Sequence, residues 1–433
     1  MFVALSILCV VASVFAPAPP GGVKEVDPTD PNAQAATDFA VAEISAQSKA
    51  VNPYVRTSFE GTQQVVSGLK YYLTIKVAES STCSKTDELS LDLCTVDMTT
   101  IHYFHAIVFW QSWKSPAYTL SEFNEVPPSD EEAKFQSFLS GNTRTYTNDV
   151  KQYEMKLMTF QDNLKIIQQL QANEQGTAEY GINEFSDISA QEFLSTRAMA
   201  NGFPESDVKL PMAPKLSTDI PTSVDWREKN VVTPVKNQGS CGSCWAFSTT
   251  GNIEGQWAIH KGKLVSLSEQ ELVDCDKVDH GCEGGLPSNA YKQIMKLGGL
   301  ETEAEYQYKA ADGKCHFEKS EVVVNINGSL NISTDEDQMA AWLASNGPIS
   351  IGINAAAMQF YLGGIADPWT IFCLPSHLDH GVLIVGYGQD GSKPFWIIKN
   401  SWGTSWGEKG YYRIIRGKGK CGLNRMPTSA TVA

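Results

Sequence analysis

The residues best suited to chemistry lie in the Gly/Ser-rich stretch 238–247, where Cys244 stands at the start of an apolar helical pattern. Unpaired backbone N–H groups at a helix N-terminus carry partial positive charge, which favours the thiolate form of a cysteine there. Because the thiolate is the nucleophile, this stretch predicts a reactive cysteine. The alternative is a buried or disulfide-bonded cysteine, which is the more common fate in an exported chain.

A cysteine nucleophile needs a base to remove its proton and a third group to hold that base in one tautomer. Among the seven histidines, His380 is the preferred base because a predicted strand follows it directly and would hold its ring. His377, three residues earlier, is the local alternative. Asn400 can accept a hydrogen bond from the ring, and Trp402 can keep water away from that bond.

Composition limits the classes of function. The chain has 433 residues, of which 42% are hydrophobic, and this length predicts two or three globular domains. The net charge of −15 arises mainly in residues 1–219, which hold 27 acidic and 15 basic side chains. Because no basic stripe is available to neutralise phosphates, we expect no nucleic-acid partner.

The first 16 residues form an apolar run that ends in small residues and is too short to span a bilayer. They predict a secretory signal peptide, with a buried strand as the alternative, and no other stretch predicts a membrane span. Of ten cysteines, Cys9 would leave with this peptide. The remaining nine are an odd number, which indicates a free thiol in an oxidising compartment.

Residues 20–125 predict a small α+β domain with a helix at 35–50 and strands at 71–77 and 101–110. Cys83 and Cys94 are close enough to link one hairpin. Residues 64–68 (QVVSG) and 81–94 resemble cystatins. Phe109 precedes Trp110 where cystatins have proline, and the cysteines of their second disulfide are absent. We therefore expect a structural or folding role in preference to tight protease inhibition.

Residues 126–219 resemble the propeptide of the papain family. An apolar stripe predicts a helix over 150–167, and Phe160, Asn163 and Ile167 match the family's helix signature, while Tyr153 and Leu157 replace its opening Glu and Arg. Residues 181–187 match the pattern G-x-N-x-F-x-D. We expect 188–219 to lie along a cleft, to loosen at acid pH, and to be cut by proteases.

From residue 220 the chain is first helical and then strand-rich, which predicts two lobes with a cleft between them. Strands are predicted at 322–326, 349–353, 382–387, 395–398 and 411–415. The stretches around Cys244, His380 and Asn400 together resemble papain-like cysteine proteases, and residues 284–291 resemble the cathepsin F-like branch. His380 and Asn400 follow Cys244 by 136 and 156 residues, near the family's usual spacing.

The resemblance implies an α+β fold: a papain-like peptidase with a helical lobe and a β-barrel-like lobe. A helical inhibitory propeptide and a cystatin-like α+β domain precede it. The implied boundaries are a signal peptide at 1–16, a cystatin-like domain at 20–125, a propeptide at 126–219 and the mature peptidase at 220–433.

The implied activity is that of a cysteine endopeptidase made as a zymogen, with a thiolate–imidazolium pair formed by Cys244 and His380. Asn400 orients the imidazole, and the side-chain amide of Gln238 stabilises the oxyanion. The implied disulfides are Cys83–Cys94, Cys241–Cys282, Cys275–Cys315 and Cys373–Cys421. No metal or other cofactor is implied.

The resemblance also assigns substrate-binding positions, which are Gly284, Gly285, Leu286, Pro287, Leu378, Asp379, Gly381, Trp402 and Met426. Glycines 284 and 285 match a ledge on which an extended substrate adds as a strand. The pocket walls among them, Leu286, Pro287, Leu378, Gly381 and Met426, are all apolar or small, with no acid at the base. We therefore expect Leu, Val or Phe, in preference to Arg, at the second position before the cut. Plain core packing is the alternative for Leu286 and Met426.

Expected partners are protein and peptide substrates, the chain's own propeptide as inhibitor, and cystatin-type inhibitors, with a monomeric mature enzyme. Asn327 and Asn331 begin glycosylation sequons, which can also arise by chance. The expected location is the secretory pathway, ending in a lysosome-like compartment or outside the cell. The rival interpretation is a binding protein, in which a cystatin-type inhibitor carries an inactive protease-like domain.

Overall fold

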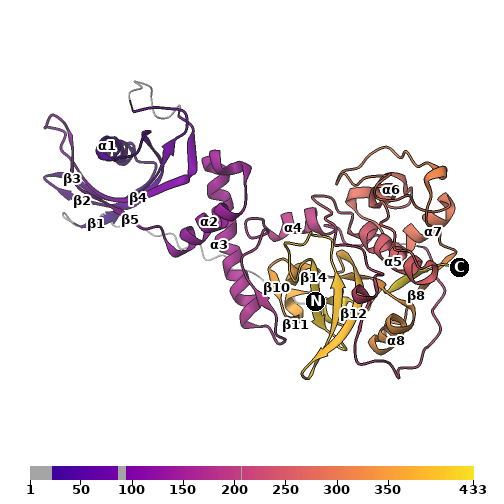
Figure 1. The fold of residues 1–433 in the computed structure, drawn as a ribbon. Helices are drawn as coiled ribbons and strands as arrows, with labels where there is room; N and C mark the ends of the chain where they lie inside the picture. Colours follow the sequence, from indigo (N-terminus) through magenta and orange to yellow (C-terminus); the bar gives the residue numbers. More distant parts are fainter. Residues whose placement is uncertain (1–21, 86–93, 206) are drawn as a thin grey trace. The chain divides into compact units, whose positions relative to one another are not determined.

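The computed structural model describes residues 22–85, 94–205 and 207–433, which fall into two units, 1–158 and 159–433. The predicted signal peptide lies outside the described residues. The division falls within helix α3 (Val150–Ala172). The N-terminal unit thus holds the predicted cystatin-like domain and the first part of the predicted propeptide (Figure 1).

The N-terminal unit is built on an antiparallel sheet in the order β1-β2-β3-β4-β5. The strands are β1 (Val23–Glu25), β2 (Tyr54–Val66), β3 (Gly68–Ser80), β4 (Val96–Trp110) and β5 (Tyr118–Val126). Helix α1 (Pro31–Gln47) packs on one face through small buried residues such as Ala33, Ala36 and Ala40. It begins earlier than predicted because Asp30 caps it, accepting a hydrogen bond from Asn32 N at 2.8 Å.

Lys76 of β3 fixes the two helices that follow the sheet. Its Nζ lies 3.3 Å from Glu132 Oε1 of α2 (Asp130–Gly141) and 2.7 Å from Glu154 Oε1 of α3. Burial alone would raise the pKa of Glu132, but the nearby Tyr103 hydroxyl and the Lys76 charge outweigh it and lower that pKa. The start of the predicted propeptide is thus tied to the cystatin-like sheet.

The C-terminal unit has two lobes. In Figure 1, helices α5 (Cys244–Lys261), α6 (Glu269–Cys275) and α7 (Pro287–Leu297) gather on one side and strands such as β12 and β14 on the other. The sheet order is β11-β14-β13-β12-β9-β15-β8, with β7 also paired to β12. These strands are β7 (Val224–Asp225), β8 (Gly328–Asn331), β9 (Ile349–Ile353), β11 (Ile365–Ala366), β12 (His380–Asp390), β13 (Lys393–Lys399), β14 (Tyr411–Ile415) and β15 (Thr428–Thr431).

The prediction of a strand at 322–326 is wrong. Val324 forms only an isolated bridge with Leu300, and the nearest strand, β8, begins at Gly328. A run of three valines has high β-propensity, but without a long partner strand the segment forms no ladder. The other four predicted strands of this domain correspond to β9, β12, β13 and β14.

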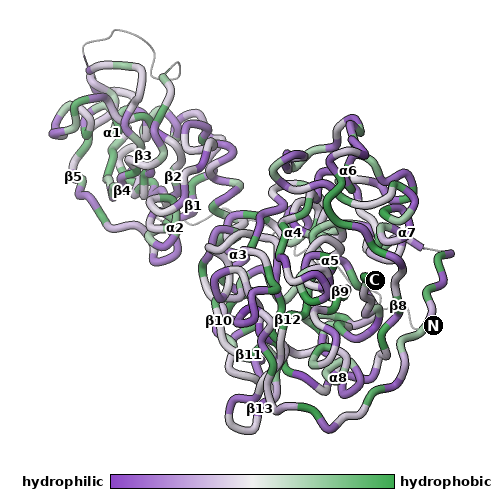
Figure 2. Tube along the Cα trace, turned by 45° about the vertical axis from the view of Figure 1, so that its right-hand side comes forward, coloured by the Kyte–Doolittle hydropathy of each residue, from purple (hydrophilic) through white to green (hydrophobic). Residues whose placement is uncertain are grey.

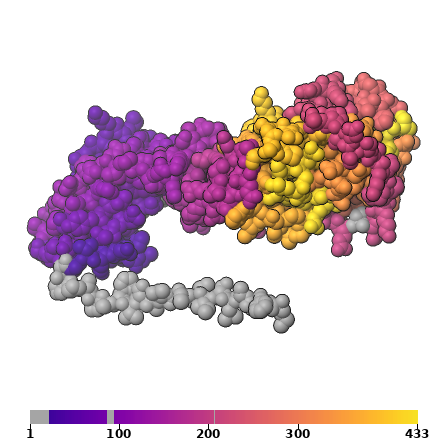
Figure 3. All heavy atoms as spheres, turned by 90° about the horizontal axis from the view of Figure 1, so that it is seen from below, coloured from indigo at the N-terminus to yellow at the C-terminus, as the bar shows by residue number. Residues whose placement is uncertain are grey.

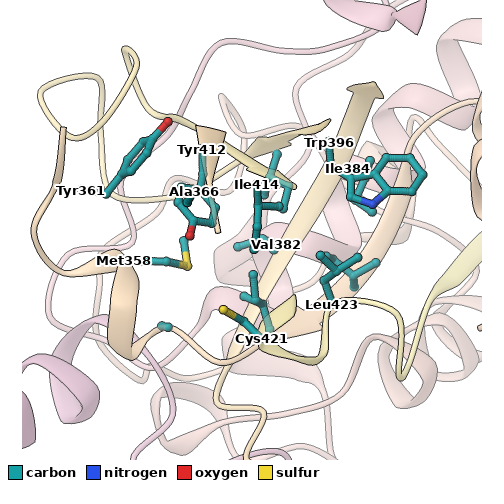
Figure 4. Close-up of a cluster of buried hydrophobic side chains, with 14 of the residues drawn as sticks. Met358, Tyr361, Ala366, Val382, Ile384, Trp396, Tyr412, Ile414, Cys421 and Leu423 are labelled. Carbon is teal, nitrogen blue, oxygen red and sulfur yellow. The ribbon is translucent and has the colours of Figure 1, made fainter. Parts of the chain in front are cut away.

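Apolar side chains from the sheet fill the second lobe. Strand β12 is buried from His380 to Gly388, and only its last two residues are exposed. Figure 2 shows the matching change from hydrophobic colour along β12 to hydrophilic colour at the β12–β13 turn. Trp396, Tyr412 and Ile414 from neighbouring strands pack with Val382 and Ile384 in one core (Figure 4).

The later part of the predicted propeptide packs on this lobe. Strand β6 (Glu179–Tyr180) pairs with β10 (Tyr361–Gly363), and Figure 3 shows magenta propeptide residues directly against yellow residues from the end of the chain. Asn163 Nδ2 donates to the carbonyls of Ser186 and Ile188, both at 2.9 Å. The motif residue Asn163 thus holds the segment that leads into α4 (Ala190–Arg197).

The structure confirms the four implied disulfides, Cys83–Cys94, Cys241–Cys282, Cys275–Cys315 and Cys373–Cys421. Among the described cysteines, Cys244 alone has a free thiol, and it is buried. The alternative in which Cys244 is disulfide-bonded is therefore wrong.

Replacing Lys76 by alanine is expected to lower the free energy of unfolding of the N-terminal unit by about 2–4 kcal/mol. The change leaves two carboxylates without their cation, and Glu154 keeps enough exposure to reduce the loss below that of a fully buried pair. Urea unfolding of the full chain carrying Cys244→Ala measures it. The control is Lys134→Ala, whose exposed pair with Asp130 should contribute less than about 0.5 kcal/mol. Equal losses for the two variants would contradict the role of Lys76.

Candidate active site

Three elements bring the predicted catalytic side chains together. Cys244 is the first residue of α5, His380 is the first residue of β12, and Asn400 directly follows β13. Strands β12 and β13 are antiparallel, with Leu383 opposite Lys399, so the start of one lies beside the end of the other. Helix α5 packs across β12, which places Cys244 near this same edge.

His380 is held in one orientation by Asn400. The ring Nε2 lies 2.7 Å from Asn400 Oδ1, which also accepts the Ser401 N–H at 2.8 Å. The ring of Trp402 stacks on the imidazole with centroids 4.7 Å apart and an interplanar angle of 25°. The other ring nitrogen, Nδ1, has no hydrogen-bond partner among the described residues. The Nδ1 atom is therefore the one available to a substrate or a nucleophile.

His377 does not belong to this arrangement. Its side chain is exposed, and its Nδ1 lies 2.9 Å from the hydroxyl of the neighbouring Ser376. The geometry therefore favours His380 over the alternative that the sequence left open.

Gly381 lets strand and helix meet. A Cβ at this position would lie 3.0 Å from the carbonyl oxygen of Cys244 and 3.1 Å from Trp245 N, closer than side chains tolerate without movement. The Gly381 N–H is also near enough to the Cys244 thiol to act on its pKa. Gly381 thus contributes to the site by its lack of a side chain.

Gln238 lies beside the start of α5 with its amide fixed. Its Nε2 donates to the Cys241 carbonyl at 2.9 Å, and its Oε1 accepts the Ser401 hydroxyl at 2.7 Å. The Cys241–Cys282 disulfide closes the intervening loop onto the segment that carries Gly284 and Gly285. The amide is therefore held beside the backbone N–H groups that begin the helix.

The predicted propeptide crosses the cleft over these residues. Trp402 Nε1 donates to the Arg197 carbonyl at 2.8 Å, and Met199 N donates to the Asp379 carbonyl at 2.7 Å. The Met199 sulfur faces Gly284, only 3.2 Å from where a Cβ would stand there. Residues 197–203 therefore cover the site, within the segment expected to line the cleft.

Burial of the site changes the pKa values of Cys244 and His380. Burial raises the pKa of the Cys244 thiol to about 12 and lowers that of His380 to about 4. With residues 197–203 in place, burial thus disfavours the charged form of both groups. The predicted thiolate–imidazolium pair belongs to the reaction with substrate, when this segment has left the site. The helix N-terminus is too weak to offset the loss of water around both groups.

A pocket beside the site holds Phe203 of the propeptide. The Phe203 ring and the Met426 side chain both approach Gly352 of β9, where a Cβ would lie 2.7 Å from each. The adjoining cavity has a volume of about 610 Å³ and includes Leu378, Asp379 and Met426 in its lining. The structure thus brings these three predicted substrate-binding residues together.

Sequence reasoning missed Gly352, which makes room for the Phe203 ring. It lies inside a predicted strand, and only its small size within an isoleucine-rich run could have drawn attention to it. The predicted walls of the pocket were all apolar or small, with no acid, but the lining also includes the carboxyl group of Asp379. The Asp379 carboxylate accepts hydrogen bonds from Ala355 N and Asn354 Nδ2, and burial raises its pKa to about 7.

Leu286 and Pro287, which were predicted as walls of this pocket, are not part of the lining of the cavity, and neither are Gly284 and Gly285. Gly285 packs against the Trp245 ring. Leu286 is buried and precedes Pro287, the first residue of α7. Of the two sequons, Asn327 is exposed, whereas the Asn331 side chain donates to the Leu210 carbonyl at 3.3 Å.

A buried ionic cluster lies behind the site and was also missed. Lys236 contacts Glu254 at 3.1 Å and Glu269 at 2.7 Å, and Lys399, next to Asn400, donates to the Thr233 hydroxyl at 2.8 Å. The cluster borders a small cavity of about 20 Å³ whose lining includes Asn400 and Ser401. No sequence motif relates these lysines and glutamates, which are up to 163 positions apart.

Within the described residues, no group of three or more His, Cys, Asp and Glu side chains has the arrangement of a metal site. None of the described helices has the length and hydropathy needed to cross a bilayer.

Comparison with known proteins agrees with this geometry. Family models match residues 220–431 (papain family cysteine protease), 135–193 (cathepsin propeptide inhibitor domain) and 21–100 (cystatin domain). Digestive procathepsin L 3 from Tenebrio molitor larval midgut superposes with a TM-score of 0.63 at 35% identity, covering 70% of this chain and all of that one.

Curated relatives include cathepsin F of Mus musculus and of Drosophila melanogaster, both 50% identical, over 69% and 65% of this chain. The matches span 64% and 47% of those two proteins. Cysteine proteinase 15A of Pisum sativum is 45% identical over 70% of this chain and 87% of its own length. With its protease, propeptide and cystatin domains, the chain belongs to the papain family of cysteine proteases.

Proposed function

We propose that the chain is the zymogen of a cysteine endopeptidase that hydrolyses peptide bonds through Cys244. The observation that carries the proposal is the His380–Asn400 hydrogen bond beneath Trp402, beside the free thiol of Cys244. A neutral cysteine needs a base with one free nitrogen and a fixed tautomer, and His380 meets both requirements.

In the proposed reaction, the Cys244 proton passes to His380 Nδ1 and the sulfur attacks the substrate carbonyl carbon. The oxyanion accepts hydrogen bonds from Gln238 Nε2 and the backbone N–H of Cys244. His380 then gives its proton to the leaving amine, and the thioester that remains is hydrolysed by water. Removal of residues 197–203 precedes this sequence because it readmits water, which stabilises the charged pair.

The cavity that holds Phe203 is proposed to accept the second residue before the cut. The Phe203 ring lies against Gly352, so this place suits a branched or aromatic apolar side chain, and the Asp379 carboxylate is turned toward Ala355 and Asn354. We therefore expect Leu, Val and Phe to be preferred over Arg there. Gly284 and Gly285 are proposed as the opposite ledge for the substrate backbone.

The proposal extends to the location, maturation and modification of the chain. We expect a lysosome-like or extracellular location, acid-promoted maturation, a monomeric mature enzyme and inhibition by cystatins. Asn327 is the better glycosylation candidate, since a glycan on Asn331 would compete with its bond to Leu210. The cystatin-like domain is proposed to hold the propeptide helices, through Lys76.

The nucleophile is tested with a peptidyl epoxide and a fluorogenic peptide. Cys244→Ala should abolish both labelling and turnover of the matured protein, because no other described thiol is free. Gln238→Ala should retain labelling but lower kcat by about 10²–10³, the typical loss for one oxyanion donor. Gln389→Ala, at the exposed end of β12, is the control and should match the parent protein. Labelling of the parent protein without turnover would favour an inhibitor with an inactive protease-like domain.

The pocket is tested with dipeptide substrates of the mature enzyme. Leu should exceed Arg in kcat/KM at the second position before the cut. Gly352→Ala should lower kcat/KM for Phe by about tenfold relative to Val, because the new methyl group occupies the space of the ring. Gly363→Ala is the matched control, since its Cβ would meet nothing closer than 3.6 Å. A preference for Arg, or an unchanged Phe/Val ratio in Gly352→Ala, would rule out this assignment.

A further inference from the structure

Two buried carboxyl groups lie on the turn between α6 and the ledge segment 280–286. Asp276 is 6% exposed and Asp279 is 7% exposed. Asp276 Oδ1 accepts the N–H groups of Val278 and Asp279 at 2.8 and 3.2 Å. The Oδ2 atoms of both aspartates are buried and have no hydrogen-bond donor among the described residues.

Asp279 reaches from this turn to the residues that follow the ledge. Its Oδ1 accepts the Leu286 N–H at 3.1 Å and the Asn289 amide at 2.9 Å, so one carboxyl oxygen binds the start of α7. Its Cβ also lies 2.7 Å from where a Cβ of Gly285 would stand. The His280 N–H closes the same loop by donating to the Gly284 carbonyl at 2.8 Å. Asp279 therefore contacts the ledge from behind.

The two carboxyl groups lack a cationic partner among the described side chains. None of the described lysine, arginine and histidine side chains lies within ion-pair distance of either group. Lys277, on the same turn, donates to the Asp274 carbonyl at 3.3 Å, and Lys292 and Lys296 of α7 and His280 are exposed. Two buried carboxylates without a cation repel each other, whereas a singly protonated pair forms a strong hydrogen bond.

The electrostatics agree with a proton on Asp279. Burial, and then the charge of Asp276, raises the pKa of Asp279 to about 8. Below that pH the Asp279 carboxyl donates to Asp276 and keeps its other oxygen for Leu286 and Asn289. Above it, the proton is lost and the two charges push the turn apart.

We propose that Asp279, hydrogen-bonded to Asp276 through one shared proton, is a positioning residue that fixes Gly284 and Gly285 for substrate binding. The inference rests on the proposed function, because those glycines bind substrate only if the chain is a peptidase. Neither aspartate touches substrate, so the effect is expected in KM more than in kcat.

Amide variants separate the shared proton from general packing. In Asp279→Asn, the new NH₂ donates to Asp276 and the oxygen still accepts from Leu286, so KM should stay within about twofold of the parent at pH 6. The double variant Asp276→Asn/Asp279→Asn sets two NH₂ groups face to face and should raise KM by about tenfold, as expected for the loss of one charged hydrogen bond. Asp279→Ala should raise KM at least as much.

The pH profile gives a readout that a purely structural role would not move. In the mature parent enzyme, KM should rise more between pH 7 and 9 than in Asp279→Asn, because Asp379 in the substrate pocket is present in both proteins whereas residue 279 titrates only in the parent. Equal profiles for the two, or a parent-like KM in the double variant or in Asp279→Ala, would overturn the proposal. A KM that changes with added Ca²⁺ or chelator would also overturn it, since a cation would then replace the proton.

Failure of the proposed function gives a different result. In that case the parent protein itself would neither turn over a peptide nor react with the epoxide. If Asp279→Ala does not fold, which thermal unfolding would reveal, the amide variants and the pH profile still decide the matter.

Discussion

The close contact between the first turn of α5 and the start of β12 is the constraint on which the site depends. At Gly381 the strand backbone touches the backbone of Cys244 and Trp245, and a single methyl group would force them apart. Because interiors are close-packed, such a shift would not stay local. This contact sets the distance between a nucleophile carried by a helix and a base carried by a strand.

The other parts of the site follow from that contact. Antiparallel pairing brings the end of β13 beside the start of β12, so Asn400 reaches the His380 ring. Behind it, Lys236 binds glutamates of α5 and α6. Burial and the charge of Glu254 raise the pKa of Glu269 to about 7, and burial lowers the pKa of Lys399. Burial therefore disfavours the charged forms of both Glu269 and Lys399. The cluster links the segment before Gln238 to both lobes.

Sequence was sufficient where chemistry depends on residue type at the end of an element. His380 begins a strand and Cys244 begins a helix, so both could be placed before any contact was known. The disulfides followed from the family resemblance. Gly352 and the Asp276–Asp279 pair could not be found in this way. Their roles come from contacts across the fold, such as that of Gly352 with Phe203, 149 positions earlier, and from burial that a local pattern does not reveal.

Contacts across the fold also act on the charge of the nucleophile, because burial raises the pKa of Cys244 in the proenzyme. A helix N-terminus favours the thiolate by a local field, and that part of the reasoning depends on α5 alone. The solvent that would stabilise a thiolate and an imidazolium is removed by residues 197–203, which come from another part of the chain. The segment that blocks the cleft therefore also suppresses the charge on the nucleophile. Phe203 fills the adjacent pocket with an apolar ring, and this packing holds residues 197–203 in place. The packing does not depend on the charge of Cys244 and His380. When residues 197–203 leave, the cleft opens to substrate and water reaches Cys244 and His380 in the same step.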